Sequence, residues 1–187
     1  GSWYGLIGLR VVPGLHVAFS PCRCRPSGPE RYWAFIEVTW VRPNRNGASV
    51  SDAASCDEIV VSRWAHVTTF EAGAAGYLHG LQSITLGDAD GGMDPEAVRE
   101  ALRPDFIHCP RTGLVCLEQT HNYAGGRVLP LSMVQGVGAV AREAGVPVHL
   151  DGARLANAVI ASGIKASDWC ESADSVSLCL SKGLGAP

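Results

Sequence analysis

The stretch PVHLDGARLANAVIASG, from Pro147 to Gly163, decides the fold class of this chain. Its first part, PVHLD (147–151), is typical of a short strand, whereas ARLANAVIASG (153–163) has helical composition and ends at a glycine suited to a C-cap. DSVSLCL (174–180) then predicts another strand. A strand, a helix and a second strand in this order indicate a parallel sheet with a crossover helix.

The same alternation continues toward the N-terminus. MDPEAVREALRP predicts a helix with Asp94 as N-cap, Pro95 in the first helical position and Pro104 at its end. A second helix is predicted from the apolar spacing of LSMVQGVGAVAREAG, which ends at Gly145. Further strands are predicted at 58–61, 80–86 and 113–120. The expected fold is therefore α/β, with a mostly parallel sheet and flanking helices.

Composition narrows the function classes. The chain has 187 residues, 47% of them hydrophobic, and a net charge of −3, so it is not disordered by composition and shows no basic excess for nucleic acid. No apolar run reaches the roughly 18 residues of a membrane helix. The seven cysteines include no Cys-x-x-Cys pair, which favours reduced thiols in the cytoplasm or an organelle over disulfides or a zinc site.

The first 50 residues differ from the rest. They hold six arginines and two acids, a net charge of +4, whereas residues 51–187 have a net charge of −7. Prolines and glycines interrupt this segment, and only Trp33–Val41 predicts a strand. The arginines are either an anion-binding patch or, as is more usual for scattered arginines, solvated side chains.

Reactive side chains follow three of the predicted strands, at the edge where parallel sheets bind ligands. Lys182, one of only two lysines, follows the strand 174–180. Burial disfavours its ammonium form and makes an amine available for Schiff-base chemistry; the alternative is a loop lysine that reaches water. Asp151 is suited to bind a pyridinium N–H or to cap the next helix. His121 is a candidate general base or water-positioning residue, or simply part of a loop with turns at Asn122 and the following glycines.

Two further residues are candidates. Arg154 is suited to bind a carboxylate or a cofactor oxygen, or is a surface arginine. His66 precedes an Ala/Gly-rich stretch, so its imidazole either lies on an aromatic ring, with Glu71 as hydrogen-bonding companion, or is an ordinary core histidine. The other histidines receive only a structural interpretation, and no metal site is predicted. The sequence has no dinucleotide-binding, P-loop or nucleophile-elbow motif.

Four of these segments together resemble the low-specificity threonine aldolases: AHVTTFEAG (65–73), CLEQTHNYAGGRVLP (116–130), VHLDGARLANA (148–158) and DSVSLCLSKGLGAP (174–187). The resemblance extends from about Cys56 to Pro187. It implies the aspartate-aminotransferase-like fold of the pyridoxal-phosphate enzymes called fold type I, within the group of β-eliminating lyases and threonine aldolases. The implied reaction is the cleavage of threonine or allo-threonine into glycine and acetaldehyde.

The resemblance also implies residue roles. Lys182 forms a Schiff base with pyridoxal phosphate, Asp151 pairs with the pyridine nitrogen and His66 stacks on the ring. Arg154 contacts cofactor or substrate, and His121 acts near the hydroxyl of a small β-hydroxy amino acid substrate. The family forms homodimers or tetramers, with neither nucleic acid nor membrane as a partner.

The resemblance suggests an incomplete enzyme. Residues 1–55 lack the family's substrate-binding serine and its Ser-Gly-Thr phosphate turn, and residues 56–187 are expected to form an incomplete cofactor-binding large domain without the C-terminal small domain. Three functions stay open: an active threonine aldolase, an inactive truncated homologue that associates with other subunits, and a related β-eliminating lyase.

Overall fold

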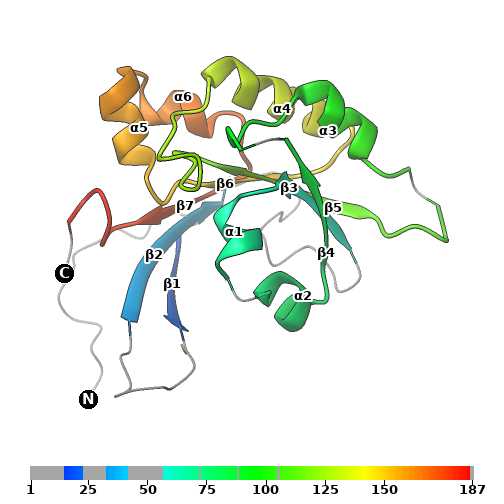
Figure 1. Ribbon diagram of the computed structural model, residues 1–187, viewed down its shortest axis with the longest axis horizontal. Coiled ribbons are helices and arrows are strands. Elements are labelled where there is room, and N and C mark those ends of the chain that lie inside the picture. The colour runs from blue at the N-terminus through cyan, green and yellow to red at the C-terminus, as the bar shows by residue number, and fades with distance from the viewer. Residues whose placement is uncertain are drawn as a thin grey trace.

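The chain folds into a seven-stranded sheet with helices on both faces (Figure 1). This computed structural model describes the backbone of 15–22 and 33–41, and residues 57–185 apart from 72, 88 and 105. The strand order is β1-β2-β7-β6-β5-β3-β4. The β4, β3, β5, β6 and β7 strands pair in parallel, whereas β2 pairs antiparallel with β1 and β7. The predicted α/β class and mostly parallel sheet are thus confirmed.

The strands and helices have these bounds. The strands are β1 (Leu15–Cys22), β2 (Trp33–Val41), β3 (Glu58–Ser62), β4 (Gln82–Leu86), β5 (Thr112–Glu118), β6 (Val148–Asp151) and β7 (Ser175–Cys179). The helices are α1 (His66–Thr69), α2 (Ala74–His79), α3 (Pro95–Ala101), α4 (Leu131–Glu143), α5 (Leu155–Ser162) and α6 (Ala166–Cys170).

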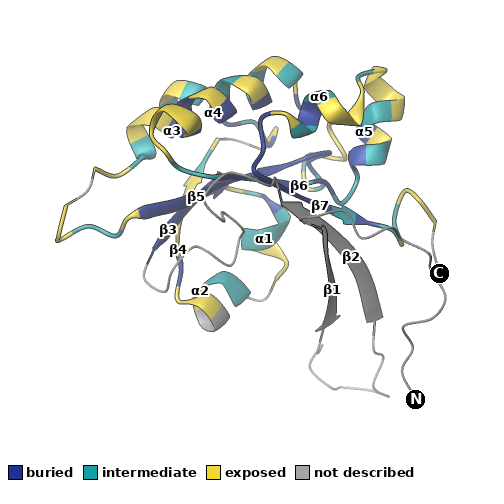
Figure 2. Cartoon of the chain, turned by 180° about the vertical axis from the view of Figure 1, so that it is seen from behind, coloured by how far each residue is buried: buried dark blue, intermediate teal, exposed yellow. Residues whose placement is uncertain are grey.

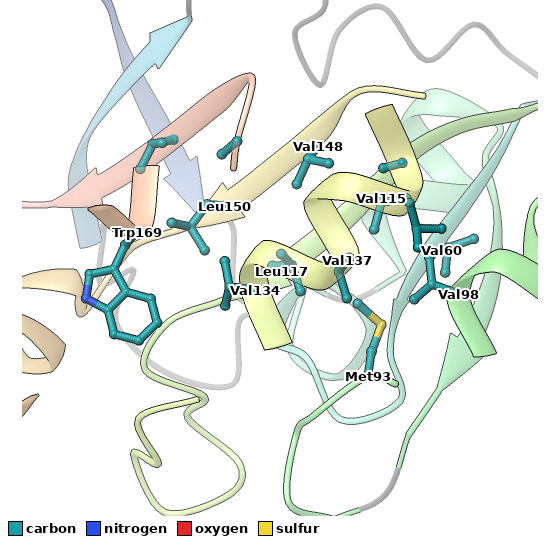
Figure 3. Close-up of a cluster of buried hydrophobic side chains, with 14 of the residues drawn as sticks. Val60, Met93, Val98, Val115, Leu117, Val134, Val137, Val148, Leu150 and Trp169 are labelled. Atoms are coloured by element: carbon teal, nitrogen blue, oxygen red, sulfur yellow. The ribbon is translucent and has the colours of Figure 1, made fainter. Parts of the chain in front are cut away.

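The larger apolar core lies between the sheet and the layer of helices α3 to α6, which covers one face (Figures 1 and 3). Alternate residues of the central strands, such as Val115 and Leu117 of β5, point into it, because successive strand residues face opposite sides. Val134 and Val137 of α4 and the fully buried Trp169 of α6 fill the space above them. A smaller cluster under α1 and α2 occupies the opposite face.

The position of the sheet between layers of helices explains which residues are buried. Every residue of β3 and β5 is buried, whereas the helices expose their outer sides (Figure 2). β4 lies at a sheet edge and is mostly exposed or half-buried. The other face of the sheet is polar at β6 and β7, where it carries no second apolar core among the described side chains. The candidate site residues lie at the carboxyl ends of β3, β5, β6 and β7.

The helix signals in the sequence act as predicted. Asp94 caps α3 by accepting the Glu96 N–H at 3.4 Å, although the helix ends at Ala101, ahead of Pro104. Gly163, with φ of 72°, ends α5. The short helices α1, α2 and α6 and the strand β1 were not predicted, since four to eight residues carry too little periodicity to stand out. No described helix is both long and apolar enough to cross a membrane.

Candidate functional site

Lys182 lies in the turn that follows β7, at the carboxyl edge of the sheet. Its side chain is half-buried and makes no hydrogen bond or ion pair with the residues that the structure describes. The next residue, Gly183, packs on α5: a Cβ there would lie 2.1 Å from Oδ1 of Asn157. Asn157 is exposed and the close atom is the far end of its side chain, so the contact places the turn beside α5 without requiring a glycine. The amine therefore lies on a turn next to α5 and remains available for chemistry.

Asp151 is the last residue of β6, beside Glu118 of β5 and Ser177 of β7 in the sheet register. Its Oδ1 accepts the Ala153 N–H at 2.9 Å, and Oδ2 has no hydrogen bond within the described part of the chain. The alternative prediction that Asp151 caps the next helix is wrong, because α5 begins at Leu155 and Arg154 occupies its N-cap position. The carboxylate instead holds the turn before the helix with one oxygen.

His66 begins α1, and its ring contacts Glu71 and Phe70. Nε2 lies 3.0 Å from Oε1 of Glu71, so the predicted contact between these two residues is confirmed. The ring stacks on Phe70, with centroids 5.1 Å apart, and Nδ1 is buried without a hydrogen-bond partner among the described residues. A buried, unpaired ring nitrogen is costly, and a ligand is one way to satisfy it.

His121 is completely buried, in the loop that follows β5. Nδ1 accepts the Ala124 N–H at 3.3 Å, so the neutral ring carries its proton on Nε2, which donates to Oγ of Ser62 at 3.2 Å. Gly91 covers the ring so closely that a Cβ there would lie 2.2 Å from Cγ of His121. Burial lowers the pKa of His121, while the charges of Glu118 and Asp90 oppose this shift. The expected turns are present, since the Gly125 N–H bonds to the Asn122 carbonyl.

Two residues at this edge escaped the sequence analysis. Ser62 ends β3 and contacts His121, and Glu118 ends β5 with one carboxylate oxygen on the His66 N–H and the other on the Asn122 N–H. Glu118 had one available signal, because it is an acid at the end of an otherwise apolar strand. Ser62 had none, since a serine after an apolar run is common.

A row of polar side chains crosses the sheet two residues before Glu118 on β5 and Asp151 on β6. Cys116, His149 and Ser175 are neighbours on β5, β6 and β7, and Nδ1 of His149 lies 2.8 Å from Oγ of Ser175. Burial, with a smaller contribution from the charge of Asp151, raises the pKa of the Cys116 thiol to about 12. Burial lowers the pKa of His149, and Asp151 opposes that shift. The thiol is therefore an inert core group.

Arg154 is half-buried between β6 and α5, and its guanidinium has no hydrogen bond or ion pair to the described residues. Of the predicted site residues, Asp151, His121 and Lys182 thus lie at or just beyond the carboxyl ends of three adjacent parallel strands, and Glu118 links the His66 segment to the loop of His121. An amine, a carboxylate and two imidazoles at one sheet edge suit covalent chemistry on a carbonyl compound, with proton transfer beside it.

Comparisons with known proteins identify the family of this chain. Residues 44–187 match the family described as beta-eliminating lyase. The chain is 40% identical to low-specificity L-threonine aldolase 1 of Arabidopsis thaliana over 148 residues, and 39% identical to the low specificity L-threonine aldolase of Escherichia coli (strain K12) over 141 residues. Each alignment covers 75% of this chain but 41% of the relative, so the chain spans less than half the length of either relative.

A solved structure supports the same assignment. The crystal structure of an aromatic amino acid beta-eliminating lyase/threonine aldolase from Exiguobacterium sp. 255-15 superposes with a TM-score of 0.58 at 26% identity. The superposition covers 68% of this chain and 34% of that one. The resemblance seen in the sequence is confirmed: the chain belongs to the beta-eliminating lyase family, a family of pyridoxal-phosphate-dependent lyases that includes the threonine aldolases.

Proposed function

We propose that this chain carries the catalytic centre of a pyridoxal-phosphate-dependent lyase that cleaves threonine or allo-threonine into glycine and acetaldehyde. One observation carries the proposal: Lys182, Asp151 and His66 lie at the carboxyl edge of the sheet, each with a polar atom that has no partner among the described residues. The names of the relatives support the same reaction class.

The residues present fit pyridoxal phosphate. When bound, this cofactor supplies an aldehyde carbon that an amine attacks and a pyridine ring that takes up the electron pair of the broken bond. The half-buried Lys182 amine suits the aldehyde, and Oδ2 of Asp151 suits the ring N–H. The buried Nδ1 of His66 is a polar atom that a bound ligand would satisfy.

Each residue has a distinct task in the proposal. Lys182 would bond the cofactor through its amine, and Asp151 would keep the ring nitrogen protonated through an ion-paired hydrogen bond. His66, which contacts Glu71 and Phe70, would lie against the ring. Arg154 binds an anionic group, either on the cofactor or the substrate carboxylate, because its guanidinium has no carboxylate partner in the described part of the chain.

His121 serves the substrate hydroxyl indirectly. With Nδ1 occupied by the Ala124 N–H and the Nε2 proton donated to Ser62, the ring has no free lone pair in this geometry. This favours the positioning role over direct proton abstraction. The Ser62 oxygen accepts a hydrogen bond from the Nε2–H of His121. Its own hydroxyl proton is therefore available to donate a hydrogen bond to a water or to the substrate.

The larger context is part of the proposal. Residues 56–187 act as the cofactor-binding part of a homodimer or tetramer in the cytoplasm, and residues 1–55, most of which lie outside the described residues, precede this part. The strand β2 pairs with β7, so this segment reaches the same sheet that carries Lys182.

Cofactor titration followed by reduction tests the function. Pyridoxal phosphate is added to the purified chain, the product is reduced with borohydride, and the modified peptide is located by mass spectrometry. A single adduct on Lys182, lost in Lys182→Ala and retained in the control Lys165→Ala, supports the proposal, as does glycine release from threonine above the Lys182→Ala background. Labelling spread over both lysines and the N-terminus, without glycine release, would overturn it and favour a protein that acts only by association.

A further inference from the structure

A single buried carboxylate connects the two histidines of the candidate site. Glu118 is 5% exposed at the end of the central strand β5. Its Oε2 accepts the backbone N–H of His66 at 2.7 Å, and its Oε1 accepts the backbone N–H of Asn122, the residue after His121, at 2.8 Å. Both are short bonds to an ionised acceptor, a class roughly twice as strong as neutral hydrogen bonds.

Hydrogen bonds within the loop that carries His121 make it move together with Asn122. The Gln119 side chain donates to the Leu129 carbonyl at 3.2 Å and accepts the Leu129 N–H at 3.0 Å, which closes the loop at its base. The His121 N–H bonds to the Arg127 carbonyl at 2.9 Å across the loop. Fixing the Asn122 amide to the strand therefore fixes the imidazole of the preceding residue.

The chemistry of Glu118 is specific to a carboxylate. Two N–H donors converge on the side chain, so it must offer two acceptor atoms, and a glutamine offers only one. Within the described residues Glu118 has no arginine or lysine partner, so its charge is compensated by backbone dipoles. A buried charge without a counter-ion is costly unless it is well hydrogen-bonded, and these two bonds meet that requirement.

We propose that Glu118 is a positioning residue that sets the distance between the His66 segment and the His121 loop. The two hydrogen bonds of Glu118 are a property of the folded chain and do not depend on any function. The role that they would have in catalysis rests on the proposed function. In the proposed function, His66 lies on the cofactor and His121 positions the group at the substrate hydroxyl. The bridge, Glu118 with its two hydrogen bonds, then holds these two histidines at a fixed distance from each other. Misplacement by about 1 Å costs on the order of 100-fold in rate.

The bridge is tested first in the unaltered chain. Through-hydrogen-bond NMR couplings from the His66 and Asn122 amide nitrogens to the same side-chain carboxyl carbon are expected. The absence of a coupling from either amide would overturn the proposal before any variant is made, and this measurement needs neither cofactor nor activity.

Matched variants then test what the bridge does. In Glu118→Gln we expect hydrogen exchange at the His66 and Asn122 amides to become at least tenfold faster, with shifted ring signals of both His66 and His121. Glu58→Gln is the control, because Glu58 is an equally buried glutamate at the opposite end of β3, paired with Arg103 at 3.3 Å. Glu118→Asp, which keeps both acceptors, is expected to recover part of the protection.

The outcomes separate the two proposals. Equal changes at both histidines in Glu58→Gln and Glu118→Gln, or unchanged exchange in Glu118→Gln, would show a merely structural glutamate and overturn the inference. If the chain turns over threonine, Glu118→Gln is expected to lower kcat about tenfold to 100-fold with little change in KM. If Lys182 forms no adduct but the amide effects appear, the proposed function fails while the bridge stands.

Discussion

Two pairs of carboxylates at opposite ends of the parallel strands have different partners. At the amino end, Glu58 is paired with Nε and Nη2 of Arg103, and Asp57 with Arg111 at 2.6 Å. At the carboxyl end, Glu118 and Asp151 are bonded to backbone N–H groups and have no cationic partner among the described residues. For these four carboxylates, the arginine-paired amino end is closed to a further cation, whereas the carboxyl end is open.

This difference separates stability from chemistry. An ion pair satisfies a carboxylate and leaves nothing for a ligand, whereas a backbone-bonded carboxylate keeps its charge for a later partner. Arg103 shows the effect of such pairing: the hydrogen bonds that it donates to Glu58 and the charge of that carboxylate raise the pKa of Arg103. The carboxyl end instead gathers the polar atoms that lack partners, which is where parallel sheets bind ligands.

The largest expected effect is that matched substitutions at the two ends change different properties, activity at one end and stability at the other. Asp151→Asn removes the charge at the open end, so we expect at least a roughly 100-fold loss of glycine release, with little change in the free energy of unfolding. Asp57→Asn removes a charge at the closed end and is expected to cost about 1–2 kcal/mol of stability without changing the Lys182 adduct. Urea unfolding, glycine assays and borohydride reduction of both variants measure this; a loss of stability in Asp151→Asn equal to that in Asp57→Asn would remove the distinction.

The next effect concerns the close packing over His121. Gly91→Ala is expected to cost about 3 kcal/mol, because it strains a left-handed residue, φ +78°, and drives a Cβ into the His121 ring. Gly125→Ala is the matched control: its φ is +77° but nothing lies within 4 Å of the added carbon, so only the conformational strain of about 1 kcal/mol is expected. Denaturant unfolding compares the two, and equal costs would mean that Gly91 does not hold the ring in place.

The smallest expected effect is a pH dependence of stability from His121 and His149. Burial lowers both pKa values below that of the unfolded chain, so between the folded value and about 6.5 the unfolded state binds more protons. Their contribution is complete above about pH 6.5 and is lost as the pH falls below it, with at most about 1.4 kcal/mol per pH unit for each histidine. Unfolding free energies between pH 5 and 7.5 measure the slope.

Single replacements assign that slope. His149→Gln and His121→Asn are each expected to flatten it by the share of the residue removed, whatever their effect on stability at pH 7. A slope unchanged in both variants would show that neither ring is kept neutral by burial.

Local sequence patterns predicted most elements of the second half of the chain. Asp94 and Pro95 mark the start of α3, and Gly163 ends α5, because caps depend on a few adjacent residues. Predictions failed by a few residues where a strand passes into a turn: Glu118 ends β5 two residues before the predicted end at 120. The following Gln119 is bonded to Leu129 in the loop rather than to a strand, a contact that no local pattern encodes.

The sequence by itself determined that Asp151, His121 and Lys182 lie at or just beyond the carboxyl ends of strands, because periodicity and turn residues are local properties. The tertiary structure decided the rest of the site: the bridge from Glu118 to His66, the glycine against His121, and the proton on Nε2 of that ring. These features depend on β3 lying between β5 and β4 in the sheet, an order set by long-range packing. Strand order is not a local property, so only the folded chain reveals which side chains meet.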